Sequence, residues 1–171
     1  THFSKDNVIV KDGLLKLRLE KKTGPANDDP AAAETDYATG FAQTFGRWTQ
    51  RYGYFEARVK LPKANCMWPA FWLMPDRGLK TGPQWVRSDT GKGKNDPGVG
   101  GMEMDIVEYL SAWGHQRYNV AFHWDGYQKA HKTMGTSAYV QADKDGYIVG
   151  GLLWTPGQII AYGNGKEIAR W

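Results

Sequence analysis

The sequence of 171 residues contains one cysteine, Cys66, so no disulfide bond can form within the chain. It also lacks any run of about 20 mostly apolar residues, the length that a helix needs to cross a membrane. No signal-peptide pattern follows Thr1. These absences exclude an intrachain disulfide scaffold and a membrane-spanning helix within residues 1–171. With Met67 and Trp68 beside it, Cys66 is expected to be a small buried apolar residue.

The basic residues are scattered along the chain rather than clustered. The 22 Lys and Arg exceed the 18 Asp and Glu, which gives a net charge of +4 and a pI near 9.1. Because the basic residues are scattered, the sequence argues against a nucleic-acid partner, which would need a basic patch. Aromatic residues are plentiful, with eight Trp and nine Tyr. Some will form the core, and the excess suggests surfaces that stack on sugar rings.

Helix signals are almost absent, and the chain is predicted to form many short strands separated by turns. Residues 21–36 are expected to form a surface loop, 75–101 a long loop at the rim of a cleft, and 125–134 a polar connection. Strands are expected over residues 7–10, 14–19, 37–48, 52–61, 67–74, 103–108, 117–124, 138–141, 147–154, 158–162 and 166–171. The first two are expected to pair as a hairpin through the Asp-Gly turn signal at 12–13. Alternation is expected to turn Phe55, Ala57, Val59, Tyr118, Val120 and Phe122 toward the core, and Glu56, Arg58, Asn119, Ala121 and His123 away from it. This pattern predicts an all-β protein, an antiparallel sandwich in which a jelly roll is one option.

Residues 100–109 hold three acids, Glu103, Asp105 and Glu108, in an otherwise apolar segment. On a strand, Glu103 and Asp105 share one face, and the apolar residue between them points the other way. Glu108 is out of phase with this alternation. One extra residue, a β-bulge near Ile106–Val107, would return Glu108 to the acidic face, and bulges are frequent beside active sites. The segment therefore predicts three carboxyls in a row.

Two carboxyls on one surface are what glycoside hydrolysis requires. A retaining enzyme needs a nucleophile and an acid about 5–5.5 Å apart. The backbone positions of Glu103 and Glu108 are about 13 Å apart at about 3.3 Å per residue, so the side chains would have to lean together over a concave sheet. Asp105 between them would act as an electrostatic helper. The alternative is a solvated strand face that is acidic by chance.

The sequence resembles glycoside hydrolase family 16 over most of its length. The matching pieces are Gly-Tyr-Phe-Glu-Ala-Arg-Val-Lys-Leu-Pro at 53–62, Trp-Pro-Ala-Phe-Trp-Leu-Met-Pro at 68–75, Glu-Met-Asp-Ile-Val-Glu at 103–108, His-Trp at 123–124 and Leu-Trp-Thr-Pro at 153–156. The resemblance implies a concanavalin A-like β-jelly roll with a concave substrate cleft. It implies a retaining mechanism that requires no cofactor and no catalytic metal, with a structural calcium as an option.

The resemblance also implies roles for single residues. Glu103 would be the nucleophile, Glu108 the general acid/base and Asp105 the electrostatic helper. Residues that would bind substrate are Glu56 and Arg58 on the donor side of the cleft, Trp68 and Trp72 as stacking rings, His123 near the acid/base, and Asn119, Trp124 and Arg87. His123 could equally be a structural histidine bonded to a neighbouring strand.

Residues 1–171 would then form a single catalytic domain that lacks the family's usual opening strand and its closing strands. Such a chain would be a fragment, or would be completed from elsewhere. A secreted or periplasmic location is expected, with a polysaccharide as partner, neither nucleic acid nor membrane as partners, and an oligomeric state left open.

The first expectation for function is endo-hydrolysis of a β-1,3-glucan. Three alternatives remain at this point. The substrate could be a marine galactan of the agar, porphyran or carrageenan type, because a mildly basic cleft rim would suit an anionic polysaccharide. The protein could be a transglycosylase, in which a sugar intercepts the intermediate. It could also be a non-catalytic carbohydrate-binding domain, although such a domain has no need of three acids in one row.

Overall fold

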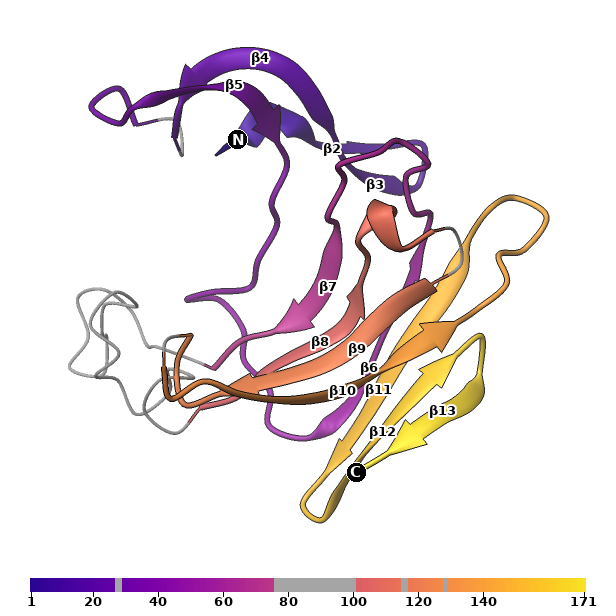
Figure 1. Cartoon of the computed structure of the whole chain (residues 1–171). Coiled ribbons are helices and arrows are strands. Elements are labelled where there is room, and N and C mark those ends of the chain that lie inside the picture. Colours follow the sequence, from indigo (N-terminus) through magenta and orange to yellow (C-terminus); the bar gives the residue numbers. More distant parts are fainter. Residues whose placement is uncertain (27–28, 76–100, 115–116, 128) are drawn as a thin grey trace. The chain divides into compact units, whose positions relative to one another are not determined.

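The computed structural model describes residues 1–26, 29–75, 101–114, 117–127 and 129–171, and strands make up most of it (Figure 1). The chain divides into two compact units, Thr1–Thr44 and Phe45–Trp171. Within the described residues, no helix has the length and apolar character needed to span a membrane. The prediction of an all-β protein is confirmed.

The first unit contains the predicted N-terminal hairpin, formed by β2 (Val8–Lys11) and β3 (Leu14–Leu17). Asp12 and Gly13 connect these strands with φ values of 54° and 73°. Both angles lie in the left-handed region that a tight two-residue hairpin turn requires, which explains the Asp-Gly pair. The turn chemistry in the sequence therefore predicted this hairpin correctly.

A three-stranded sheet completes the first unit, in the order β1 (His2–Phe3), β5 (Glu34–Thr39), β4 (Leu19–Pro25). A single turn of 3₁₀ helix, Lys5–Asn7, precedes the hairpin. Two predictions are wrong here. Residues 21–36 are not one loop, because β4 and β5 pair across a shorter connection. The strand expected over 37–48 is also displaced. Strand β5 begins at Glu34, within the polar stretch, and ends at Thr39.

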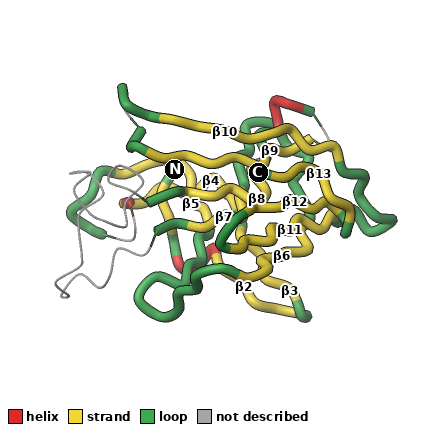
Figure 2. Tube along the Cα trace, turned by 90° about the horizontal axis from the view of Figure 1, so that it is seen from below, coloured by secondary structure: helices red, strands yellow, loops and turns green. Residues whose placement is uncertain are grey.

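The second unit is a sandwich of two antiparallel four-stranded sheets, in the orders β10-β9-β8-β7 and β13-β12-β11-β6. The strands of the first sheet lie side by side in Figure 2. Their bounds are β7 Ala70–Leu73, β8 Glu103–Glu108, β9 Arg117–Trp124 and β10 Lys132–Tyr139, with a 3₁₀ turn at Ser111–Trp113. The second sheet contains β6 Gly53–Val59, β11 Ile148–Thr155, β12 Gln158–Gly163 and β13 Lys166–Arg170.

The hydrophobic core lies between these two sheets. Ile106 of β8, Tyr118 and Phe122 of β9 and Leu152 of β11 are each almost completely buried, and Phe55 of β6 is buried against them. Burying an aliphatic or aromatic side chain of this size contributes about 1.5–3 kcal/mol. The alternation in the sequence predicted the core side of β9 and β6 correctly.

Glycine allows the two sheets to approach closely beneath the acidic strand. A Cβ atom at Gly150 of β11 would lie 2.2 Å from Cγ2 of Val107 in β8, a distance that real side chains do not adopt. Gly150 therefore makes room for Val107 at the point where the predicted bulge falls. The Gly-Gly pair of β11 has a packing reason that composition alone did not reveal.

Other boundaries differ in smaller ways. Strand β10 begins at Lys132, inside the segment predicted as a polar connection. Cys66 is exposed, with φ of 62°, so the prediction that it is buried is wrong. Most of the predicted loop at 75–101 lies outside the described residues.

Candidate active site

The predicted bulge in the acidic strand is present. Asp105 pairs with Ala121 and Glu108 with Asn119, so two residues of β8 separate the paired positions where β9 has only one. The pairing with β7 shifts at the same place. Ile106 and Val107 are both 1% exposed, so the extra residue is accommodated on the core side. The bulge thus returns Glu108 to the face of Glu103 and Asp105, as the sequence predicted.

Strand register places the three acids in a grid on the sheet face that points away from the core. Directly paired residues project from the same face of a sheet. In this grid Glu103 lies opposite His123, Asp105 lies between Trp72 and Ala121, and Glu108 lies between Ala70 and Asn119. The structure therefore brings together most of the predicted site residues on three neighbouring strands.

Asp105 is the buried member of the acidic row, only 3% exposed. Burial, together with the nearby charges of Glu103 and Glu108, raises the pKa of Asp105 to about 8. At neutral pH this carboxyl therefore holds a proton. Its Oδ2 atom lies 3.4 Å from Nε2 of His123, and a protonated carboxyl does not form an ion pair there. The row can hold three acids because one of them stays uncharged.

The outer glutamates are accessible and have hydrogen-bond partners. The indole Nε1 of Trp68 donates a hydrogen bond of 3.0 Å to Oε1 of Glu108. The ring of Trp68 is 68% exposed, so it offers an apolar surface immediately beside this carboxyl. An exposed ring next to an acid is suited to hold a sugar residue over the acid.

A hollow of about 400 Å³ opens beside Glu108 over strands β9 and β10. Ala121 and Gly135, which are paired across these strands, have little or no side chain and leave its floor low. Polar residues form its walls, including Asn119, His123, Thr133 and Ser137. A polar hollow beside an acid is chemically suited to a sugar, whose hydroxyl groups need donors and acceptors.

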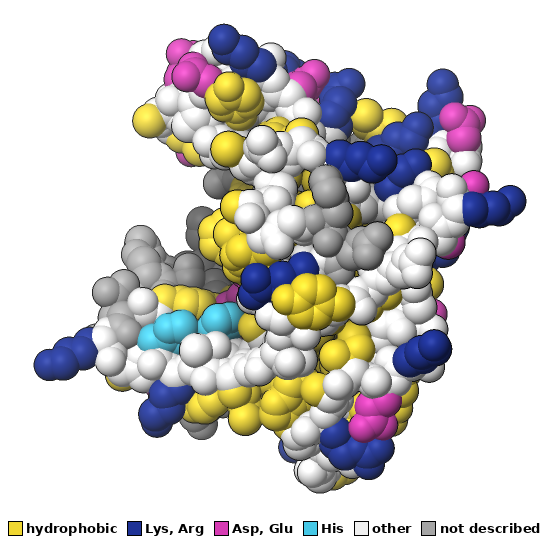
Figure 3. All heavy atoms as spheres, turned by 45° about the vertical axis from the view of Figure 1, so that its right-hand side comes forward, with side chains coloured by type: hydrophobic (Ala, Val, Ile, Leu, Met, Phe, Trp, Pro, Cys, Tyr) yellow, Lys and Arg dark blue, Asp and Glu magenta, His cyan; other side chains and the backbone are white. Residues whose placement is uncertain are grey.

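Two functional candidates in this region were missed by the sequence reasoning. The Tyr127 hydroxyl donates a hydrogen bond to Oε2 of Glu103. Nε2 of His131 lies 2.9 Å from Nδ1 of His123, with the two rings stacked at 5.1 Å. Figure 3 shows histidine side chains adjacent to one another at the surface. The turn signal Asp125-Gly126 was the available clue to this arrangement.

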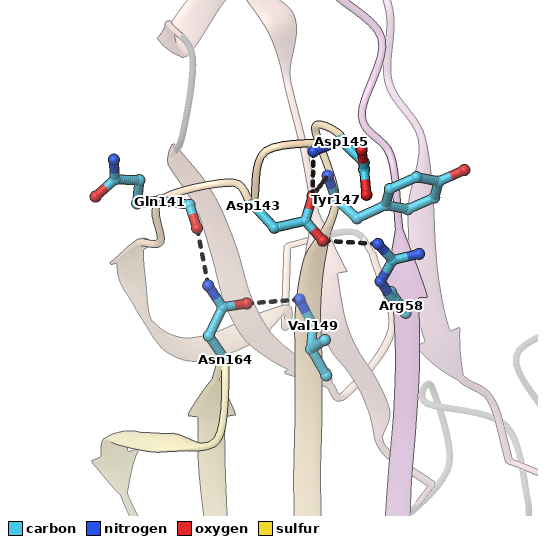
Figure 4. Close-up of polar contacts among 7 residues, drawn as sticks. All are labelled: Arg58, Gln141, Asp143, Asp145, Tyr147, Val149 and Asn164. Carbon is cyan, nitrogen blue, oxygen red and sulfur yellow. Dashed lines mark hydrogen bonds and ion pairs between the residues drawn. The ribbon is translucent and has the colours of Figure 1, made fainter.

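Glu56 and Arg58 are not brought to the acids, which corrects their predicted place in the cleft. Both lie on β6 in the other sheet, on the face that points away from the core. Arg58 makes a 2.6 Å ion pair with Asp143 and lies over the ring of Tyr147 (Figure 4). Glu56 accepts a hydrogen bond of 2.6 Å from Tyr54. Alternation predicted their exposure but could not predict which sheet β6 joins.

Two further predicted site residues do not fall in the grid. Trp124 is partly buried and packs against the core, because it follows His123 and so points to the opposite face of β9. Its prediction as a substrate-binding residue is therefore corrected. Arg87 lies outside the described residues. Among the residues that are described, no group of three or more His, Cys, Asp and Glu is arranged to hold a metal ion.

A β-sandwich with a bulged row of carboxyls on one face, flanked by tryptophans, has the arrangement of a glycoside hydrolase that works through two carboxyls. The comparison of sequences agrees, because the sequence model of glycosyl hydrolases family 16 matches residues 1–171. The chain belongs to this family.

Two groups of known proteins are similar to this chain. Endo-1,3-1,4-beta-glycanase EglC of Rhizobium meliloti is 30% identical over 164 residues, which cover 94% of this chain and 29% of that protein. The laminarinase catalytic domain from Thermotoga maritima has a TM-score of 0.72 at 20% identity, covering 99% of this chain and 61% of that one. A laminarinase domain from Thermotoga petrophila RKU-1 has a TM-score of 0.74 at 20% identity, with 98% and 60% covered.

These likenesses confirm the predicted β-jelly-roll fold. The chain spans about three tenths of the length of the curated relative EglC and about three fifths of the two solved laminarinase domains.

Proposed function

We propose that this protein is an endo-acting, retaining hydrolase of β-glucans with β-1,3 linkages. The observation that carries the proposal is the register shift in β8, which puts Glu103, Asp105 and Glu108 on one face. Relatives named as endo-1,3-1,4-beta-glycanase and as glucan endo-1,3-beta-glucosidase support a β-glucan as substrate. Their names favour a glucan over the galactans, which remain the second choice.

The reaction would proceed in two displacements. In the first, a carboxylate oxygen of Glu103 attacks the anomeric carbon, and Glu108 gives its proton to the glycosidic oxygen of the departing glycan. Glu103 is then an ester of the remaining sugar. In the second, Glu108 takes a proton from a water molecule, whose oxygen attacks the anomeric carbon and releases Glu103 as a carboxylate. Both inversions together retain the configuration.

Asp105 would support these steps through its proton. A third negative charge between Glu103 and Glu108 would oppose the ionised state of both glutamates. Because burial and neighbouring charges raise the pKa of Asp105 to about 8, the row carries one charge fewer at neutral pH. The protonated carboxyl can also donate a hydrogen bond within the row. Asp105 is thus proposed as an electrostatic helper rather than a third participant in proton transfer to the substrate.

Trp68 and Trp72 are proposed as the sugar-stacking residues of the cleft, and Asn119 and His123 as polar contacts. Trp68 donates a hydrogen bond to Glu108, and Trp72 is paired with Asp105 across neighbouring strands, so both tryptophans lie beside the row of acids. The mechanism uses only side chains and water, so it requires no cofactor. We expect the enzyme to act outside the cytoplasm, where polysaccharide substrates occur.

The test is release of reducing ends from laminarin, mixed-linkage β-glucan, agarose, porphyran and carrageenans by wild type and Glu103→Ala. Release from laminarin or mixed-linkage glucan, lost in Glu103→Ala, is the expected result. Glu167→Ala is the matched control, because it removes only an exposed ion pair with Arg170 on β13. Release from a galactan alone would show that the substrate is a galactan and not a β-glucan. Normal release by a folded Glu103→Ala variant would refute the mechanism.

A further inference from the structure

The connection between β9 and β10 contacts two members of the acidic row, one directly and one through a histidine. Its described residues are 125–127 and 129–131, and the two displacements proposed above assign them no role. Tyr127 reaches Glu103, and His131 reaches His123, which contacts Asp105. The rings of Tyr127 and His131 lie 5.8 Å apart, so the two contacts form one cluster.

Local sequence explains why this connection folds back over the row. Asp125 and Gly126 have φ values of 59° and 77°, so the chain reverses sharply just after β9 ends. An ion pair of 2.6 Å between Asp125 and Lys132 joins the end of β9 to the start of β10. The turn and the ion pair hold both ends of the connection that carries Tyr127 and His131.

The Tyr127 hydrogen bond bears on the proposed nucleophile. A hydroxyl that donates to one oxygen of a carboxylate fixes the rotation of that carboxylate. Because Tyr127 bonds Oε2 of Glu103, Oε1 is left as the attacking oxygen. The ring of Tyr127 is 51% exposed and is therefore accessible next to the place where the reacting sugar would lie.

The His131 contact bears on Asp105 through the tautomer of His123. In a bond between two imidazole nitrogens, one must donate and the other accept. The contact of 2.9 Å therefore couples the tautomer of His123 to that of His131, and so bears on whether the Nε2 atom that faces Asp105 at 3.4 Å carries hydrogen. The charged or titratable groups that line this region are Glu103, Asp105 and Glu108 from β8, Arg117 from β9, and Tyr127 and His131 from the connection.

We propose that Tyr127 and His131 are positioning residues for the double displacement. Tyr127 orients Glu103, and His131 orients Asp105 by setting the tautomer of His123. The role in turnover rests on the proposed function, whereas the tautomer can be measured without any substrate.

The first test is Tyr127→Phe, which keeps the ring and removes the donor. We expect kcat to fall roughly ten- to a hundredfold, the usual range for a lost hydrogen bond to a charged group, with KM little changed. The loss should persist on an aryl β-oligoglucoside with an activated leaving group. In Glu108→Gln the first displacement should recover on that substrate, because the leaving group no longer needs a proton, whereas the second displacement still lacks its base.

The exposed neighbour Lys129→Ala is the matched control for the connection and should keep wild-type kcat. Unchanged kcat in Tyr127→Phe would overturn its role, and so would a change confined to KM, which would indicate sugar binding alone.

The second test follows the imidazole nitrogens of His123 by ¹⁵N NMR. We expect one fixed tautomer in wild type and in His131→Gln, whose amide can replace the ring as hydrogen-bond partner. In His131→Leu we expect averaged nitrogen shifts and a lower kcat. An unchanged tautomer in His131→Leu would refute the inference even if wild type were inactive on every glycan. Inactive wild type with the predicted tautomer change would refute the proposed function alone.

Discussion

The outward faces of the two sheets in the second unit use the same residue types in different ways. On β6, Arg58 is paired with Asp143, whose pKa is held below its usual value by hydrogen bonds from the Tyr147 amide and the Arg58 guanidinium. On β8, three acids lie together, and the pKa of Asp105 is raised to about 8. Neutralised charges on a surface indicate a structural role, whereas like charges crowded against a core indicate chemistry.

The largest expected effect is a loss of activity when acids are replaced on the outward face of β8, but not when an acid is replaced on the other sheet. Glu103→Gln and Glu108→Gln should each lower kcat on a β-glucan by about a thousandfold or more, since each removes a group that forms or breaks bonds. Glu167→Gln, on the other sheet, should keep wild-type kcat. Rates of reducing-end release from laminarin measure all three. Equal rates for Glu103→Gln and Glu167→Gln would contradict the assignment of catalysis to the face of β8.

The next effect is the pH dependence of stability that Asp105 causes. Its folded pKa of about 8 lies above the ordinary aspartate pKa of 3.8, so the folded state binds the proton more tightly. Stability should therefore fall as pH rises between about 4 and 8, by at most about 1.4 kcal/mol per pH unit. Asp105→Asn should lack this slope. Urea unfolding at pH 5, 7 and 9 measures it, and parallel curves for both proteins would contradict a protonated Asp105.

A smaller effect tests the packing beneath the bulge. Gly150→Ala would place a methyl group against Val107, and should cost about 1–3 kcal/mol of unfolding free energy. Gly157→Ala is the matched control, because nothing lies within 4 Å of a Cβ there. Thermal melts of both variants give the comparison. Equal stability of the two would show that the sheets do not approach as closely as described.

The smallest effect belongs to the paired charges of β6. Asp143→Asn removes the partner of Arg58, but both groups are well exposed, and exposed ion pairs contribute little. We expect a slight fall in the thermal midpoint and an unchanged kcat. A marked loss of kcat would place this cluster in the cleft after all.

The sequence predicted the acidic row well because the row depends on local pattern. Alternation fixed the faces of Glu103 and Asp105, and the phase of Glu108 required one extra residue, which the register contains. The same alternation, continued by one residue, would have placed Trp124 on the core face, where the structure has it. Where spacing within one strand determines which face a side chain occupies, the prediction was correct.

Properties that depend on pairing between strands were not predictable in the same way. Nothing in residues 53–62 shows which sheet β6 joins, so Glu56 and Arg58 were assigned to the wrong face of the sandwich. Tyr127 and His131 were missed because their contacts depend on how the connection turns back. Most of β4 and the first half of β5 were missed because their sequences are polar, and pairing rather than propensity forms them.

The most direct test of the account is the configuration of the first product. ¹H NMR can follow the anomeric proton of the reducing end newly released from laminarin by wild-type protein. We expect the β-anomer to appear first and the α-anomer only later by mutarotation, because two displacements retain configuration. Initial release of the α-anomer would contradict it, since a single displacement by water would then replace the ester on Glu103.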